Sequence, residues 1–302
     1  MKSIGVYHPD NIENFKIILI KLTAVIDSFA KDMLNGKPKL TKPQGVANKL
    51  LNRTRTNLEG IIFLLDPFKE QPFIFHSISH IYRALTVDFL NYCYLMCFYD
   101  ESEPNFNSFR NEYDFFNRDY LKTLIDWNEI EKKIPESCPA YSNINSQTQP
   151  RDENLVTLKS YFNGLFQNND INKKIKTAEE IRESSKDLYF PDKKDKIEPK
   201  TSMLSESYKF RRILKSDFAQ YSDIFLFYKY FSQQYHFSAH SNLHAGSNSK
   251  DENYHYLVWT TVRLMDIIAL QFELLSQDGE SSRPIKVLQL QIDNCLKPLS
   301  DL

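Results

Sequence analysis

The sequence predicts an all-α protein, a multi-helix bundle of about eight to nine helices with long loops. Two observations carry this prediction. Apolar residues recur at spacings of three and four along most of the chain, and no segment alternates apolar and polar residues as a half-buried strand would. The chain also contains only 7 glycines in 302 residues. Folds rich in strands and turns use glycine freely at positive φ, so this scarcity favours helices.

Capping and breaking residues set the expected ends of the helices. The first helix should run from Asp10 to Leu34, because Asp10 can cap it and the sequence Asn-Gly-Lys-Pro follows it. The second should end before Pro67, since an interior proline removes a helical hydrogen bond. Thr177 and Glu180 have the spacing of a capping box that opens a short helix. Further helices are expected over residues 72–99, 108–133, 154–167, 207–214, 216–245, 251–275 and 285–296.

The expected helix over residues 108–133 is amphipathic. Its aromatic and apolar residues follow one another at spacings of three and four, so they should share one inward face. Tyr120 and Trp127 belong to this face, as do Phe109, Tyr113, Phe116 and Leu124.

The middle of the chain should interrupt the bundle. Residues 134–152 hold three prolines among many Ser, Asn and Gln, and residues 192–200 form a mixed charge run. We therefore predict a single helical-bundle domain over residues 1–302, with a loop-rich insertion around residues 134–206. The charge run is either a solvated loop, or a mobile flap or phosphate-binding arm next to the site helix, and the sequence leaves these interpretations open.

Charge and cysteine content limit the partners and the compartment. With 38 basic and 39 acidic residues, the chain has no overall field that would attract nucleic acid or an anionic membrane, although a local basic patch remains compatible with this balance. The longest apolar stretch, Leu85–Tyr99, is shorter than the ~20 residues of a spanning helix, so no membrane contact is expected. Four scattered cysteines and an N-terminus without a signal pattern predict reduced thiols and a cytoplasmic protein.

Two of the expected helices carry the candidate site. The stretch 225–246 contains Tyr228, Ser232, His236, His240 and His244, each four residues from the next. Residues four apart lie on one face of a helix, so these side chains would form a polar stripe on an otherwise aromatic helix.

The helix over residues 72–99 carries a second set of polar residues. His76, His80 and Arg83 follow one another at spacings of four and three, so they should also share a face. Polar residues are few in this apolar segment, and we expect the two helices to meet at these faces.

The order Tyr228-x-x-x-Ser232-x-x-x-His236 resembles a signature in a broad group of bacterial all-helical proteins of unknown function. Members also place an arginine-containing helix earlier in the chain, which here corresponds to Arg83. An acidic residue commonly takes the fifth position of that segment, whereas this chain has Val87 there and Asp88 one place later. The resemblance implies a helical fold and a bacterial source, and it implies no established reaction.

A weaker similarity is to the HEPN group, helical bundles common in bacterial toxin and antiviral systems. RNase members of that group have an arginine followed four to six residues later by a histidine. No arginine of this chain has a histidine in that window. The resemblance therefore implies a HEPN-like bundle in which Arg83 and His236 would have to replace the usual pair in space.

Three functional hypotheses follow. In the first, Arg83, Tyr228, Ser232 and His236 form a pocket that binds or cleaves a phosphate-bearing ligand, a nucleotide or RNA, in a defence or stress role. Histidine titrates near neutral pH and can act as a base, and arginine can hold an anion. Ser232 lacks the strained turn that exposes a nucleophilic serine. With so few glycines, classical nucleotide-binding loops are excluded.

The other two hypotheses use the same histidines differently. His76, His80, His236 and His240 could ligate zinc in a zinc-dependent hydrolase, because imidazoles one helical turn apart can reach one ion. Alternatively, the histidines only pack, Arg83 and Asp88 form a buried ion pair, and the protein is a non-enzymatic interaction module. Long aromatic helices would also suit a homodimer. The sequence leaves these alternatives open.

Overall fold

The computed structural model of the protein describes residues 6–34, 39–137, 148–177, 180–181, 205–235, 250–276, 279–292 and 295. These residues form α-helices and short 3-10 turns, joined by loops that contain one isolated bridge between Phe166 and Ile175. The predicted all-α fold is confirmed. None of the helices in these ranges is long and apolar enough to cross a membrane.

Residue contacts divide the chain into two compact units. The first combines Met1–Cys97 with Glu206–Leu302, and the second is Phe98–Ser205. We expected a single bundle with an insertion around residues 134–206. The segment between the two halves of the first unit begins earlier, at Phe98, so the long helix that starts at Asn107 belongs to the inserted unit.

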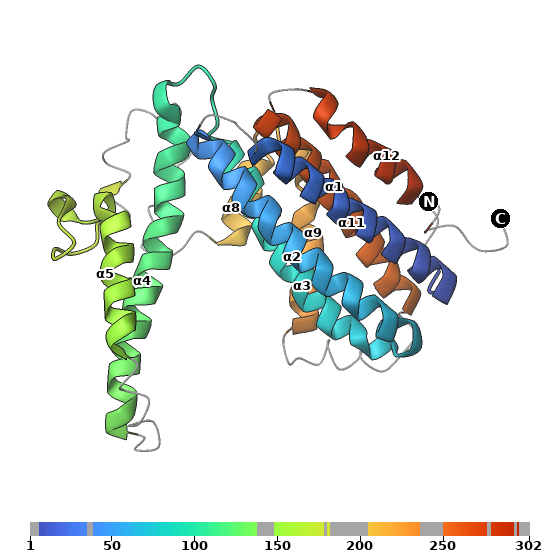
Figure 1. The fold of residues 1–302 in the computed structure, drawn as a ribbon, viewed down its shortest axis with the longest axis horizontal. Coiled ribbons are helices and arrows are strands. Elements are labelled where there is room, and N and C mark those ends of the chain that lie inside the picture. Colours follow the sequence, from blue (N-terminus) through green and yellow to red (C-terminus); the bar gives the residue numbers. More distant parts are fainter. Residues whose placement is uncertain are drawn as a thin grey trace. The chain divides into compact units, whose positions relative to one another are not determined.

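The first unit is a bundle of long helices that lie side by side (Figure 1). The helix α3 packs most extensively against α9, and α2 packs against α1, α3 and α11. Buried hydroxyl groups join the helices inside the apolar core: the Tyr82 and Thr261 hydroxyl oxygens lie 2.7 Å apart, and the Tyr254 hydroxyl donates to the Asn11 carbonyl at 2.8 Å. The helices of this unit are α1 (Pro9–Leu34), α2 (Lys42–Glu70), α3 (Phe75–Met96), α8 (Glu206–Ile213), α9 (Ile224–Tyr235), α11 (Lys250–Ser276) and α12 (Arg283–Ile292).

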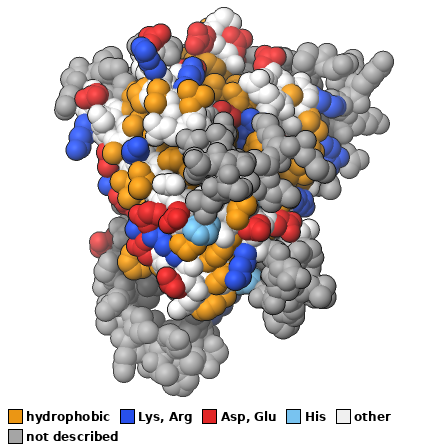
Figure 2. Space-filling model, turned by 90° about the vertical axis from the view of Figure 1, so that its right-hand side faces the viewer, with side chains coloured by type: hydrophobic (Ala, Val, Ile, Leu, Met, Phe, Trp, Pro, Cys, Tyr) orange, Lys and Arg blue, Asp and Glu red, His pale blue; other side chains and the backbone are white. Residues whose placement is uncertain are grey.

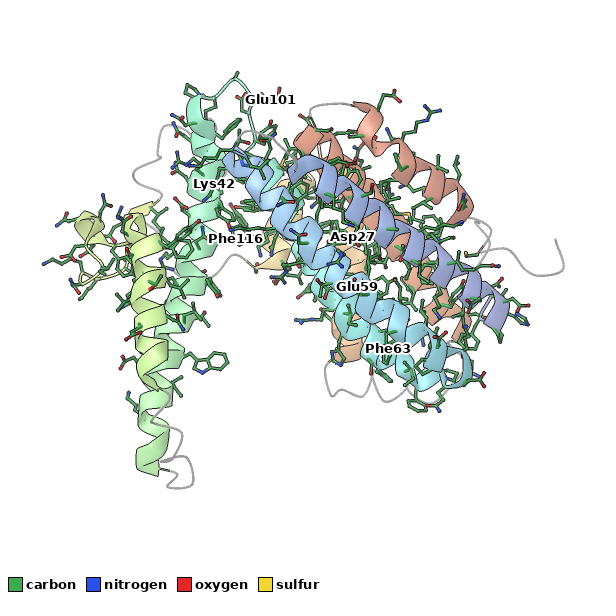
Figure 3. The ribbon with its side chains drawn as sticks, in the orientation of Figure 1. Asp27, Lys42, Glu59, Phe63, Glu101 and Phe116 are labelled. Atoms are coloured by element: carbon green, nitrogen blue, oxygen red, sulfur yellow. The ribbon has the colours of Figure 1, made fainter. Side chains whose placement is uncertain are left out.

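Helix α2 continues past the proline at which we expected it to end. Pro67 lies inside the helix, which reaches Glu70 and is closed by the Gln71 amide donating to the Pro67 carbonyl at 2.9 Å. A proline removes its own hydrogen bond to the carbonyl four residues earlier, here at Phe63, and its ring crowds that carbonyl. The Phe63 side chain is 78% exposed (Figure 3), so this side of the helix faces solvent. Burial of Phe68, worth about 1.5–3 kcal/mol, favours the continued turn.

The second unit contains two long antiparallel helices, α4 (Asn107–Ser137) and α5 (Thr148–Tyr161), which lie side by side in Figure 1. Residues 134–137 and 148–152, expected in a loop, belong to these helices. The predicted capping box is confirmed: the Thr177 amide donates to Glu180 Oε2 at 2.6 Å, and the Glu180 amide donates to Thr177 Oγ1 at 3.1 Å. Glu180 and Ile181 then begin a helical turn.

The inward face predicted for α4 is wrong at two of its aromatic residues, Tyr120 and Trp127. Tyr120 and Trp127 are 56% and 60% exposed. The helix carries two apolar faces, and the other one, with Phe115 and Leu121, packs into the core of the unit. Periodicity alone does not distinguish the two faces, because both repeat at helical spacing.

The described cysteines have free thiols, as expected. Cys93 and Cys295 are buried, and burial raises the pKa of both thiols. The Cys97 thiol donates to Ser216 Oγ at 3.2 Å, and its pKa is also raised by burial. Cys138 lies outside the described residues.

Candidate functional site

Helices α3 and α9 bring Arg83, Tyr228 and Ser232 together. The Arg83 Nε donates a hydrogen bond to Ser232 Oγ at 3.2 Å, and the Arg83 guanidinium carbon lies 6.0 Å from the centre of the Tyr228 ring. Ser232 is only 8% exposed, whereas Arg83 and Tyr228 are partly exposed. The two helices therefore meet as the sequence predicts, and three of the four residues expected in the acid–base pocket lie next to one another.

Aromatic packing fixes the spacing of the two helices at this point. The Tyr82 ring stacks on Phe231 with centroids 5.3 Å apart, and Phe75 lies 6.4 Å from Phe231. Phe75 also meets the Tyr230 ring at 6.3 Å. Because rigid buried rings allow little sliding, the Arg83–Ser232 hydrogen bond forms at a defined position at the edge of this interface.

A line of three rings continues from Tyr228 to helix α8. Phe210 of α8 stacks on Phe225 of α9, with centroids 4.5 Å apart and planes 14° apart. Phe225 stacks in turn with Tyr228 at 5.8 Å and 27°. We call Phe210, Phe225 and Tyr228 the aromatic strip.

An exposed lysine covers part of the aromatic strip. The Lys229 ammonium lies 5.2 Å from the centre of the Phe225 ring and 5.8 Å from that of Tyr228. With Arg83 over Tyr228, two cations therefore lie on the rings of α9, within the range of cation–π attraction. Sequence reasoning missed Phe210, Phe225 and Lys229 as parts of the site. The spacing of Phe225, Tyr228 and Lys229 on one helix was the available signal.

The histidines expected in the site are only partly described. On α3, burial lowers the pKa of His76, and the nearby His80, which is exposed, adds to this effect. His236, His240 and His244 lie outside the described residues. Within the described ranges, no group of three His, Cys, Asp or Glu side chains is arranged to hold a metal ion. The predicted zinc set of His76, His80, His236 and His240 therefore stays a prediction.

No protein-family model matches this chain, and no curated protein or solved structure matches it either. The resemblances to the Tyr-x-x-x-Ser-x-x-x-His group and to HEPN bundles rest on the residues of the sequence, and they stay predictions.

The packing hypothesis expected Asp88 to pair with Arg83, and this expectation is wrong. The Asp88 Oδ2 lies 2.9 Å from Arg53 Nε, so this ion pair joins α3 to α2. Residues five apart on a helix point in different directions, at 100° per residue, and Asp88 is thereby turned away from Arg83. Burial raises the pKa of the Asp88 carboxyl, while Arg53 opposes the shift.

The side chain of Lys209, next to Phe210 of the aromatic strip, is fully buried in the first unit. The Lys209 ammonium, on α8, donates to Asn91 Oδ1 of α3 at 2.7 Å, and the lysine side chain is buried. This bond ties α8 to α3 one residue before Phe210. Lys209 therefore positions the ring at the far end of the aromatic strip.

Acidic and basic side chains are interspersed on the face shown in Figure 2, and the overall charge is −1. Attraction of an anion to this protein therefore depends on local groups. Arg83 and Lys229 are such groups, because both lie against the rings of α9.

Proposed function

We propose that the protein binds a phosphate-bearing ligand, a nucleotide or RNA, at Arg83, Ser232 and Tyr228. The observation that carries this proposal is the hydrogen bond from Arg83 Nε to Ser232 Oγ, with the guanidinium set against the Tyr228 ring. The guanidinium is planar, permanently charged and matched to phosphate oxygens. A bond at Nε fixes the orientation of that plane before a ligand arrives, which lowers the entropy that binding must overcome.

Cleavage of the ligand is a further step of the same proposal. It requires a base, and the sequence supplies His236 one helical turn after Ser232. The described residues support the binding part, through Arg83 and its neighbours. A role in a defence or stress system is supported by the HEPN resemblance, and a cytoplasmic location is supported by the free thiols.

The experiment is calorimetric titration of the full chain with inorganic pyrophosphate. Arg83→Gln keeps a polar side chain but removes the charge, and it should abolish measurable binding. The matched control is Arg283→Gln, because Arg283 is an exposed arginine of α12 with a distant ion-pair partner, Glu280, at 3.9 Å. Equal binding by the wild type and Arg83→Gln would refute the proposal.

A further inference from the structure

We infer that the ligand of the Arg83 site carries at least two directly linked phosphate groups, as a diphosphate or a longer phosphate chain does. Arg83 of α3 would hold one of these groups, and Lys229 of α9 would hold another. This inference rests on the proposed function of the Arg83 site, and it names the class of ligand that the site takes.

Arg83 and Lys229 reach the same stretch of helix α9. The Arg83 Nε donates to Ser232 Oγ at 3.2 Å. Lys229 precedes Ser232 by three residues, and side chains at that spacing are neighbours on a helix surface, with Cβ atoms about 5–6 Å apart. The two cations lie 6.0 and 5.8 Å from the centre of the Tyr228 ring, so their charges are at most about 12 Å apart. A ligand with two neighbouring anionic groups can therefore contact both.

The rings next to Lys229 hold its ammonium in place and leave it able to bind an anion. The ammonium lies 5.2 Å from the centre of the Phe225 ring and 5.8 Å from that of Tyr228. Among the described residues, Lys229 has these ring contacts and no carboxylate partner. An ammonium has three N–H donors, so a phosphate can bind on the solvent side of Lys229, which is exposed, while the ring contacts persist.

The helices around the site carry an excess of positive charge. Helices α3, α8 and α9 pack against one another, and together they hold two acidic side chains and five basic ones. Asp88, the acidic residue of α3, is already paired with Arg53 of α2. The chain as a whole has 38 basic and 39 acidic residues, so this excess is local. A ligand with several negative charges gains more from it than a ligand with one or two. The basic side chains are Arg83, Lys209, Arg211, Arg212 and Lys229.

The presence of a second cation distinguishes between kinds of phosphate ligand. A single phosphate can be bound by the Arg83 guanidinium alone, through two parallel hydrogen bonds. Lys229 adds affinity when a second anionic group follows closely on the first. In a nucleic-acid strand a sugar separates successive phosphates, and each phosphate carries one charge. A chain of directly linked phosphates concentrates more charge next to the two cations, so the site favours such a chain.

The test is calorimetric titration of the full chain, in buffer without divalent cations, with inorganic phosphate, pyrophosphate and tripolyphosphate. A second charge-assisted contact should make pyrophosphate bind about tenfold more tightly than phosphate. Titration with ADP shows whether the linked phosphates come from a nucleotide, which would bind more tightly than pyrophosphate, or from an inorganic chain. Equal binding of phosphate and pyrophosphate would overturn the inference, and so would tighter binding of an oligouridylate strand than of pyrophosphate and ADP.

Variants of Lys229 locate the second contact. Lys229→Ala and Lys229→Gln remove the charge from an exposed position of a helix, and both should abolish the tenfold preference for pyrophosphate over phosphate. Lys229→Arg keeps the charge and should retain the preference. The control is Lys49→Ala, because Lys49 is an exposed lysine of α2 in the same unit. A loss of folded protein weakens both ligands equally and leaves the preference unchanged. A preference that survives in Lys229→Ala and Lys229→Gln would overturn the inference.

The failure of this inference can be separated from the failure of the proposed function. If Arg83→Gln loses pyrophosphate binding but the wild type binds phosphate as tightly as pyrophosphate, the Arg83 site stands and the second contact does not exist. If the wild type binds neither phosphate, pyrophosphate, tripolyphosphate nor ADP, both are refuted.

Discussion

Gln271 offers a direct test of how the core of the first unit is assembled. It lies on α11 with a fully buried side chain, and within the described residues neither its Nε2 nor its Oε1 has a hydrogen-bond partner. Its neighbours along the helix, Ile267, Ile268 and Phe272, are buried apolar residues. A buried amide without partners loses its bonds to water and gains nothing in return.

Replacing Gln271 with Met should therefore stabilise the protein. Methionine has a similar length and no strongly polar atoms, so the substitution removes the desolvation cost without opening a large cavity. Protein mutational data put that cost at about 1–3 kcal/mol. For a unit of this size, each kcal/mol corresponds to about 2–4 °C in Tm, so the variant should melt several degrees higher.

The assay is urea denaturation of Gln271→Met beside Thr261→Val, which provides a matched control on the same helix. Thr261 is equally buried, but its hydroxyl contacts the Tyr82 hydroxyl at 2.7 Å and donates to the Leu257 carbonyl at 2.9 Å. The valine variant should lose about 1–3 kcal/mol, because the Tyr82 hydroxyl keeps no partner there. Opposite signs for the two substitutions are the prediction. Destabilisation by Gln271→Met would show that the amide is paired in solution, for example by a buried water.

Three further predictions concern individual contacts. Burial raises the pKa of Asp88 in the folded state, so the ionised carboxyl destabilises the fold. Asp88→Asn should therefore be more stable than wild type at neutral pH. The difference in stability should shrink as the pH falls toward the ordinary pKa of ~4, where the carboxyl becomes protonated in both states. Denaturation at several pH values checks this; a difference that grows on acidification would contradict it. Tyr7→Phe removes the hydroxyl that donates to the Phe68 and Lys69 carbonyls and should cost about 1 kcal/mol by urea denaturation, whereas no loss would mean that this contact adds nothing. Thr177→Ala removes the side-chain half of the capping box and should speed amide exchange at Glu180; unchanged exchange would exclude a capping role.

Much of the fold was predictable because helical periodicity and end signals are local. The start of α1 near Asp10 and the Thr177–Glu180 capping box could be predicted from neighbouring residues. The end of α2 could not, because it depends on Phe68 packing against Tyr7, with ring centroids 5.1 Å apart. The exposure of Trp127 likewise depends on which of two apolar faces of α4 the rest of its unit covers.

The site was predictable where its residues share a helix face. Tyr228 and Ser232 lie one turn apart, and the few polar residues of α3 singled out Arg83 as the partner. The Arg53–Asp88 ion pair and the Phe210–Phe225 stack join different helices. Such contacts depend on how the helices are placed against one another, and no local spacing encodes that placement.

The central claim is that Arg83 is held in place for a phosphate ligand rather than for the fold alone. The most direct measurement compares the Tm of wild type and Arg83→Gln with and without pyrophosphate. At about 100 times Kd, a ligand that binds only the folded state adds about 2.7 kcal/mol, so the wild-type Tm should rise while that of the folded variant stays unchanged. An equal rise in both proteins, no rise in either, or failure of the variant to fold would contradict the claim.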